Sequence, residues 1–541
     1  MSSTIIALSG PICSGKTTLA KLLEQEAGGT VIKTREMILS ERPKTKQARR
    51  SLQLAGESLD RDTNGQWVAR QVGRKLQGMP TSPTYIVIDS VRIEAQLVAL
   101  RRAFGNKVIH IHLDAGDDSL SVRYSARSEG SSTSELKNLA EAQKNKTEKN
   151  VRALARIADI VIETDRCTAQ DVWTRVSARI GFRLPNATRL VDVLIGGQYG
   201  SEGKGNIVHH LAPEYDILVR VGGPNAGHKV FIPDEKPFTF HQLPSGALAN
   251  SSAHLILGAG AVISLERLLS EIASLSVPYD RLSIDPQAMI IEKADIQYEQ
   301  GNLRDEIAST AQGVGSATAR KILNRKVETD VRLARDIPEL KHYIRDTIHE
   351  LSKAICAGKR ILLEGTQGTS LSLHHGHYPH VTSRVTTAVG CLAEAGISAQ
   401  HLRRVVLVCR SYPIRVGNTD SNKTSGHMEQ EIDLEMIAKR SGLDIEELKK
   451  TERTSTTNRA RRIAEFDWAQ MKRSVFLNGP TDIALTFADY INSENRNAYR
   501  FDQLSPETVL FIEELEKVFG VPVSLISTQF ALRNIIDRRS W

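Results

Sequence analysis

Cysteine is scarce in this 541-residue sequence, and its five occurrences are scattered: Cys13, Cys167, Cys356, Cys391 and Cys409. None of them forms a CxxC pair or has the spacing of a metal site. The pattern therefore favours reduced thiols over a disulfide framework or a cysteine-ligated metal. Reduced thiols are typical of a cytoplasmic protein, which is the location we expect.

Long apolar runs are also missing. The apolar stretch at 255–263 contains glycines and is far too short to span a membrane. At the amino terminus no basic stretch precedes an apolar segment, so we expect no secretory signal. The sequence predicts no membrane partner.

Charge of one sign is only mildly in excess: 71 Lys and Arg against 63 Asp and Glu give a formal charge of +8. Such an excess suits either a nucleic-acid surface or several sites for phosphate and carboxylate ligands. The basic residues are not gathered into a tail, and no nucleic-acid-binding motif is found. Small anionic substrates are favoured, with no nucleic acid as partner.

The length favours two or more domains, and 40% hydrophobic with 25% charged residues is ordinary for a globular enzyme. Strand signals at 4–8, 85–89, 107–113 and 157–163 alternate with helical signals at 18–26, 92–104 and 169–180. Alternation of this kind predicts a parallel sheet covered by helices. A linker-like stretch at 181–188 precedes a fresh strand at Leu190. We predict an α/β protein with one domain over 1–183 and another, with a large and mostly parallel sheet, over 190–541.

The first glycine loop fits the pattern GxxxxGK[ST], with Gly10, Gly15, Lys16 and Thr17 at its fixed positions. It follows a strand and opens a helix, which is the context that the motif requires. Backbone N–H groups can close around phosphates, Lys16 can reach the β and γ oxygens, and Thr17 can ligate Mg²⁺. The sequence predicts an ATP site here, against the alternative of a chance glycine turn.

Five more positions of the first domain are candidates for phosphoryl transfer. Asp89 ends a strand, where it could organise a metal or water, or simply form a turn. Arg123 and Arg127 lie four apart on an expected helix and could cover the phosphoryl group or form a solvated face. The pair at 34–35 could grip an acceptor phosphate or be plain loop. The segment resembles the small P-loop kinases that act on nucleotides, and its acceptor stays open.

A second strand-to-helix glycine loop occupies 196–206. It is not a Walker A motif, because its spacing differs and no Ser or Thr follows the lysine. Dense glycines, a lysine and a helix start still suit a phosphate cradle. The candidate cradle residues are Gly200, Glu202, Gly203, Lys204 and Gly205.

Six more blocks follow in order: GGPNAGHK at 222–229, HQLPSG at 241–246, STAQGVG at 309–315, EGTQGTSL at 364–371, HGHYPHVTS at 375–383 and STTNRARR at 455–462. Together with the loop they resemble adenylosuccinate synthetase over most of 190–541. That family joins L-aspartate to carbon 6 of a purine nucleoside monophosphate. The 6-oxygen is first phosphorylated by a nucleoside triphosphate and then displaced by the aspartate amine.

The resemblance implies roles for individual residues. His228 would be the general acid at the 6-oxygen, although a buried structural histidine is the alternative, and Gln367 would hold the 6-oxyanion. Mg²⁺ would be held at Ser201 and Gly227. The implied acceptor-binding residues are Asn225, Thr310, Gln367 and Thr382, and the implied aspartate-binding residues are Val416, Thr457, Arg459 and Arg461. The family also implies a homodimer, in which a neighbour's arginine from the region 320–325 would reach the acceptor phosphate.

One departure from the family concerns the acceptor. The family's loop reads GDEGKG and its aspartate is a base and a metal ligand, whereas this chain has Ser201. A hydroxyl is neither a useful base nor a strong ligand for a hard cation. The domain could be inactive, could use hypoxanthine with a substitute base, or could take another purine. Serine leaves room for a guanine 2-amino group, and the exchange resembles the viral branch that converts dGMP to N6-succino-2-amino-deoxyadenylate.

A second departure concerns the donor. The family's TKLD is here Thr486-Phe-Ala-Asp489, so the lysine that helps to clasp guanine is lost. Phe487 could line an adenine pocket beside Asp489, or be plain core. ATP or dATP is the preferred donor and GTP the alternative. Competing interpretations of the whole chain are an ordinary synthetase that uses IMP and GTP, an inert nucleotide-binding scaffold, and a first domain that acts as a sensor.

Overall fold

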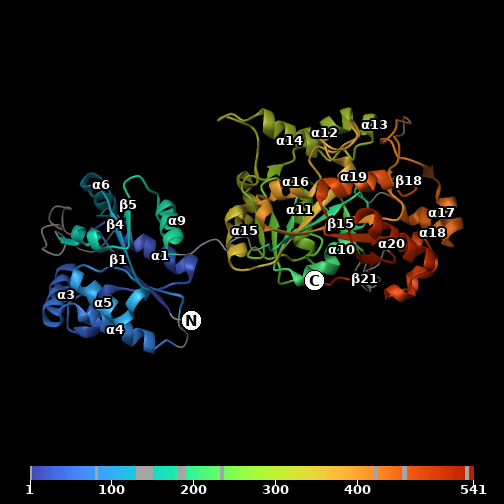
Figure 1. Ribbon diagram of the computed structural model, residues 1–541. Coiled ribbons are helices and arrows are strands. Elements are labelled where there is room, and N and C mark those ends of the chain that lie inside the picture. The colour runs from blue at the N-terminus through green and yellow to red at the C-terminus, as the bar shows by residue number, and fades with distance from the viewer. Residues whose placement is uncertain are drawn as a thin grey trace. The chain divides into compact units, whose positions relative to one another are not determined.

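The computed structural model describes residues 3–79, 83–128, 150–180, 189–231, 237–419, 421, 423–453, 460–529 and 535–540. The chain divides into two compact units, Met1–Arg183 and Leu184–Trp541. Both are α/β, each around its own mainly parallel sheet, which confirms the predicted fold class (Figure 1). Each unit is described by itself.

The first unit has a parallel five-stranded sheet in the order β2-β3-β1-β4-β5. Its strands are β1 (Thr4–Ser9), β2 (Thr30–Ile32), β3 (Tyr85–Ile88), β4 (Val108–Asp114) and β5 (Ile160–Glu163). Its α-helices are α1 (Lys16–Ala27), α2 (Thr34–Glu41), α3 (Arg49–Thr63), α4 (Gln66–Gln77), α5 (Glu94–Phe104), α6 (Asp117–Ser128) and α9 (Ala169–Arg179), and 3-10 turns cover Gly105–Lys107 and Val151–Ile157.

Strand β1 lies in the middle of this sheet and is buried on both faces. Ile5 and Ala7 belong to one core cluster and Ile6 and Leu8 to another, as the period of two along a strand requires. Beyond its end the chain turns at Gly10, whose φ is +137° and where a Cβ would lie 2.0 Å from a backbone carbonyl oxygen of β4. The glycine loop therefore packs directly against the sheet.

The second unit has a nine-stranded sheet in the order β12-β10-β7-β14-β6-β15-β19-β20-β21. All neighbours are parallel except β20 and β21. The strands are β6 (Val191–Gly196), β7 (Ile217–Arg220), β10 (His254–Leu257), β12 (Leu282–Ile284), β14 (Ile361–Gly368), β15 (Leu402–Arg410), β19 (Asp482–Thr486), β20 (Val523–Ser527) and β21 (Ile535–Asp537).

Helices surround the large sheet (Figure 1), and the unit also has three small sheets. The small sheets pair β8 (His228–Val230) with β9 (Phe238–Phe240), β11 (Val262–Ile263) with β13 (Met289–Ile290), and β18 (Arg461–Ala464) with both β16 (Ile414–Val416) and β17 (Glu431–Ile432). The α-helices are α10 (Lys204–Leu211), α11 (Leu265–Ser274), α12 (Lys293–Asn302), α13 (Arg304–Ile307), α14 (Val314–Leu323), α15 (Thr347–Cys356), α16 (Ala388–Ala395), α17 (Leu434–Ser441), α18 (Ile445–Thr451), α19 (Trp468–Asn478) and α20 (Pro506–Phe519).

The central strands of the large sheet are apolar on both faces, as expected for a parallel sheet covered by helices. Val193 and Ile195 of β6 face one core cluster, and Leu194 faces the other. Polar and charged side chains appear where these strands end, at Arg220 of β7 and Arg410 of β15. In open parallel sheets ligands bind at the carboxyl ends of the strands. The core thus places polar groups where a site is expected.

Among the helices described in either unit, none combines the length and the apolar composition that a membrane crossing would need.

Candidate active sites

The second unit contains a cavity of about 450 Å³ above the carboxyl ends of its central strands. Its walls come from the loop after β6, the segment leading into β8, the end of β14, and the region around β16, β18 and β19. Segments far apart in the sequence therefore meet there. The predicted residues that line it are Gly200, Ser201, Gly203, Lys204, Gly205, Asn225, Gly227, His228, Thr310, Gln367, Thr382, Val416, Arg461, Phe487 and Asp489.

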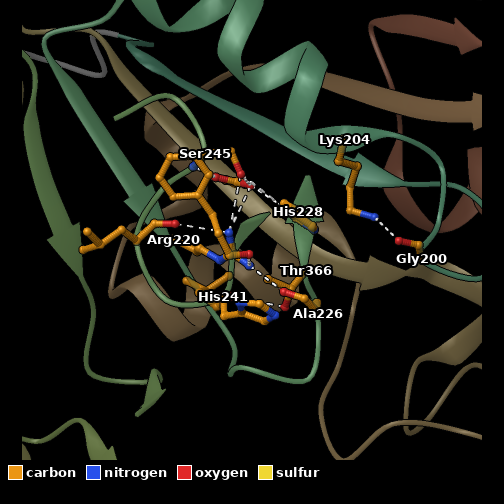
Figure 2. Close-up of polar contacts among 12 residues, drawn as sticks. Gly200, Lys204, Arg220, Ala226, His228, His241, Ser245 and Thr366 are labelled. Carbon is orange, nitrogen blue, oxygen red and sulfur yellow. Dashed lines mark hydrogen bonds and ion pairs between the residues drawn. The ribbon is translucent and has the colours of Figure 1, made fainter. Parts of the chain in front are cut away.

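The loop after β6 is held from inside by Glu202, which does not line the cavity and is fully buried. Its carboxylate accepts hydrogen bonds from the backbone N–H groups of Gln198 and Gly200, at 3.0 and 2.7 Å, and pairs with Lys204 at 2.7 Å. Lys204 also donates to the carbonyl of Gly200 at 2.9 Å, as Figure 2 shows. The glutamate thus shapes the loop, and Lys204 places a cation at the start of α10.

His228 is the best-supported candidate for proton transfer in this cavity. Its Nδ1 is hydrogen-bonded to Glu364 of β14, and the same carboxylate accepts from the Ser245 backbone N–H at 2.7 Å and hydroxyl at 2.5 Å. Arg220 lies 3.6 Å from this carboxylate. The Nε2 atom of His228 is buried and has no hydrogen-bond partner among the described residues. One ring nitrogen is therefore fixed, and the other is available to a ligand.

Charge around this histidine is tightly balanced. Burial, and then the Arg220 guanidinium, lower the pKa of His228 to about 4. Burial alone would raise the pKa of Glu364, but Arg220 and His228 together lower it to about 2. At neutral pH the pair is therefore a carboxylate and a neutral imidazole whose Nδ1 carries the proton. His228 can act as an acid only when an anionic ligand raises its pKa.

Gln367 adopts a left-handed backbone conformation, with φ +64°, at an irregularity near the end of β14. Its amide donates to the Thr382 hydroxyl at 2.8 Å, and its Oε1 atom is buried without a partner in the described structure. A Cβ at Gly200 would lie 2.9 Å from the Cα of Gln367, so only glycine allows this close approach. The glycine loop and the amide therefore form one assembly.

The far side of the cavity contains a buried ion cluster around Glu452. Its carboxylate accepts from Arg410 at 2.7 Å, from Tyr490 at 2.6 Å and from Arg461 at 3.1 Å. The guanidinium of Arg410 also lies 3.8 Å from the ring centroid of Phe487. Arg461, an expected aspartate ligand, is thus oriented by Glu452. Thr457 and Arg459, expected beside it, lie outside the described residues.

This cluster leads to a prediction on stability. Burial raises the pKa of Glu452, but Arg410 and Arg461 lower it overall to about 2. Glu452→Gln should lower the free energy of unfolding by about 3–5 kcal/mol, because the buried guanidinium of Arg410 and the partly buried one of Arg461 lose their counter-charge. In the wild type this stabilisation is present above the unfolded-state pKa of about 4.3 and is lost as the pH falls toward about 2. Urea unfolding measures it.

The matched control is Glu447→Gln, since that carboxylate is half-exposed and pairs with Arg496. It should change stability by less than about 1 kcal/mol. An equal effect of both changes would contradict the special role of Glu452.

Asp489 and Phe487, the expected donor-base residues, stand together just after β19. Burial raises the pKa of Asp489 to about 6, although Arg496 opposes the shift. Arg496 donates to one carboxylate oxygen at 3.1 Å, and the other is buried without a partner in the described part of the chain. Phe487 is 8% exposed, packs in an apolar cluster and also lines the cavity. It is core and cavity wall at once.

The first unit has a larger cavity, of about 1190 Å³, around its glycine loop. Gly15, Lys16, Thr17, Asp89 and Arg123 line it, and Gly10 lies beneath it against β4. Lys16 donates to the carbonyls of Gly10 and Pro11, both at 2.7 Å.

Two other candidates of the first unit are held by neighbours. Asp89 accepts from both the backbone N–H and the hydroxyl of Thr34 at 2.8 Å, and Arg123 binds the hydroxyl and carbonyl of Thr164 at 3.0 and 2.6 Å. Arg127 belongs to α6, and its side chain lies outside the described residues. The structure thus brings the loop, Asp89 and Arg123 to one cavity.

Several residues around the two cavities were not singled out from the sequence. All three of Arg220, Glu364 and Arg410 are charged and buried; the arginines end β7 and β15, and Glu364 lies within β14. A charged residue at the end of an apolar strand was the signal that could have found the two arginines. Asp60 and Trp67 of the first unit carry no comparable signal, because they lie in or between amphipathic helices.

Three comparisons place the chain among known proteins. The family model for adenylosuccinate synthetase matches residues 193–336 and 323–496, and that for an AAA domain matches residues 6–148. Adenylosuccinate synthetase of Pyrococcus horikoshii is 36% identical over 354 residues, covering 64% of this chain and 98% of the relative. That of Archaeoglobus fulgidus is 36% identical over 352 residues, covering 64% and 98%. The chain is therefore a carbon–nitrogen ligase of the adenylosuccinate synthetase family, and it carries an amino-terminal P-loop domain.

Two solved structures are also similar. One is the succinoaminodeoxyadenylate synthetase of cyanophage S-2L bound to dGMP and dATP, with TM-score 0.54 and 27% identity, covering 65% of this chain and 96% of the other. The other is adenylosuccinate synthetase of Plasmodium falciparum, with TM-score 0.56 and 24% identity, covering 65% and 100%. The family resemblance expected from the ordered sequence blocks is confirmed.

Proposed function

We propose that the second unit, residues 190–541, joins L-aspartate to carbon 6 of a guanine nucleotide with ATP or dATP as phosphoryl donor. The observation that supports this most is Ser201, which stands at the cavity wall where the family has a carboxylate. Among the described residues its hydroxyl has no hydrogen-bond partner, so it can meet a ligand. The cyanophage relative, whose structure holds dGMP and dATP, supports the same assignment.

The residues of the cavity fit the two steps of the reaction. The γ-phosphoryl group passes to the 6-oxygen, and then the aspartate amine attacks carbon 6 and phosphate leaves. Lys204 and the backbone N–H groups of the loop stabilise the charge on the transferring group. His228, held by Glu364, delivers Nε2 toward the 6-oxygen. Gln367 would turn its amide over, so that the NH₂ group meets the oxyanion and Oε1 accepts from Thr382.

Other residues of the cavity would bind the acceptor nucleotide and aspartate. Asn225, whose buried Oδ1 has no partner in the described residues, and Thr310 would hold the acceptor nucleotide. Val416 and Arg461, with Thr457 and Arg459 beyond the described part, would bind aspartate, because guanidinium groups suit its carboxylates.

We also propose a homodimer, in which an arginine from the region 320–325 of the neighbouring subunit reaches the acceptor phosphate. Within that region, Arg320 of α14 is paired with Asp295 of its own chain, at 3.1 and 2.7 Å.

Magnesium fits this arrangement only with the help of substrate. The described residues contain no group of three or more His, Cys, Asp or Glu that could hold a metal. Mg²⁺ usually binds through phosphate oxygens and few protein ligands. The Gly227 carbonyl and the Ser201 hydroxyl could contribute in the second unit, and Thr17 in the first, where Mg²⁺ would neutralise phosphate charge.

The test is a reaction of the full chain with Mg²⁺, aspartate and ATP, using dGMP, GMP, IMP and dIMP in parallel and GTP as the other donor. Phosphate release and the mass of the succinylated product are measured. Activity confined to guanine nucleotides is expected. Activity with IMP and GTP alone would instead establish an ordinary adenylosuccinate synthetase, which the 36% identity to the archaeal enzymes favours.

We propose that the first unit, residues 1–183, is a nucleotide kinase. Lys16→Ala should abolish its phosphoryl transfer, lowering the rate by at least about 100-fold, since the lysine neutralises the transferring charge. Ligation of aspartate should be unchanged. Nucleotide binding without any Lys16-dependent transfer would make this unit a sensor.

A further inference from the structure

The cavity of the first unit extends well beyond the phosphate loop. Its volume of about 1190 Å³ exceeds the about 300–1,000 Å³ of a single small-molecule site. Residues after β5, from Thr164 to Val172, line one end, and residues of α3 and α5 line the other. Lys16, the first residue of α1, lies between them. The cavity therefore has room for a donor at one end and an acceptor at the other.

Asp60 of α3 stands at the acceptor end in a fixed orientation. Its Oδ1 accepts from the indole N–H of Trp67 at 2.7 Å and from the amide of Gln96 at 2.8 Å. Gln96 in turn accepts from the backbone N–H of Arg92 at 2.9 Å. Trp67 is 1% and Gln96 3% exposed, so neither can move freely. Both bonds fall on Oδ1, which leaves Oδ2 for a ligand.

The charges around this carboxylate act in opposite directions, with a net rise in its pKa. Burial raises the pKa of Asp60, the Trp67 and Gln96 hydrogen bonds oppose the shift, Glu57, one helical turn earlier, raises it further, and the charge of Arg92 opposes it. Glu57 and Gln53 also line this end of the cavity. A ligand edge with neighbouring N–H donors would satisfy the Oδ2 atom of Asp60, whereas a ligand edge with acceptors would be repelled.

We propose that this end binds the base of a guanine nucleoside monophosphate, with Oδ2 of Asp60 accepting from N1–H and the 2-amino group. The proposal rests on the kinase function proposed for this unit. Arg35 and Arg92 also line the cavity and would hold the acceptor phosphate. An oxygen of that phosphate attacks the γ-phosphorus of ATP, the bond to ADP breaks, and a nucleoside diphosphate forms.

Purines should then rank by the donors on their edge. Guanine has two adjacent N–H groups, hypoxanthine keeps only N1–H, and adenine offers an acceptor at N1. A site built to bind an N–H donor rejects a base without it by about 10⁴-fold or more in the strongest cases. We expect dGMP to exceed dIMP, and dIMP to exceed dAMP, in kcat/KM.

The experiment uses the full chain with ATP and Mg²⁺ but without aspartate, so that the ligase is idle, and measures nucleoside diphosphate formation from dGMP, dIMP, dAMP and dTMP. In Asp60→Asn the amide oxygen can still accept from Trp67 and Gln96, while its NH₂ replaces Oδ2. The ratio of kcat/KM for dGMP over dAMP should fall by about 100-fold. Asp62→Asn, an exposed position on α3 paired with Arg42, should leave the ratio unchanged.

The outcomes separate the two proposals. The guanine subsite is overturned if diphosphate formation depends on Lys16 but is equal for dGMP and dAMP. It is also overturned if Asp60→Asn leaves the ratio of kcat/KM for dGMP over dAMP unchanged. In both cases the kinase function is retained. No diphosphate from any acceptor overturns both. If Asp60→Asn acted only by disturbing the structure, kcat/KM would fall equally for all acceptors. The ratio would then be unchanged, which also counts against the guanine subsite.

Discussion

His228→Asn is expected to lower the kcat/KM of aspartate ligation by about 10³-fold, within the range typical of a lost general acid. The amide keeps a polar group beside Glu364 but cannot deliver a proton to the 6-oxygen. The buried Nε2 without a partner is the observation behind this expectation. Product formation from dGMP, aspartate and ATP measures it, with an unchanged melting temperature as the check on folding.

Glu364→Gln separates positioning from proton transfer. The carboxylate fixes the Nδ1 proton of His228, and an amide in its place could stabilise the other tautomer. We expect a large loss of kcat with little change in KM for aspartate. Retention of full ligation in His228→Asn would show that this histidine is structural.

The fold was largely predictable because each unit repeats a strand-to-helix alternation with clear glycine loops. The predicted strand at 4–8 is β1 (Thr4–Ser9), and the expected helix at 169–180 is α9 (Ala169–Arg179). Some boundaries differ: the strand signal at 157–163 begins on the last residue of the 3-10 turn Val151–Ile157, and β5 begins only at Ile160. Buried parallel strands can be recognised in a sequence by their continuous apolar runs.

The sites were predictable only where a motif carries them. Glu364 begins the sequence block EGTQGTSL, but its pairing with His228 across 136 positions depends on tertiary structure alone. The cluster of Arg410, Glu452 and Tyr490 likewise joins a strand end, a helix end and a 3-10 turn. The burial and the partners of a single charged residue are set by the folded chain and cannot be predicted from its place in the sequence. The same holds for Asp60.

Ser201→Asp is the change expected to redirect the ligase. In the wild type the small hydroxyl leaves room beside N1 and C2 of the purine, where guanine carries its amino group. An aspartate would fill that space and restore the base and metal ligand of the ordinary family loop. Activity with dGMP should fall by at least about 100-fold, while activity with IMP should appear or rise.

The physical alternative is that specificity is set elsewhere in the cavity. The backbone carbonyl of Ser201 accepts from Arg410 at 3.4 Å, so the new side chain could disturb the Arg410 and Glu452 pair instead of the acceptor. Ser201→Asn distinguishes the two, because it matches aspartate in size but is neither a base nor a charge. If volume decides, both changes should abolish dGMP use and only the aspartate should gain IMP. Equal use of dGMP by the wild type and Ser201→Asp would place the recognition of the 2-amino group away from this loop.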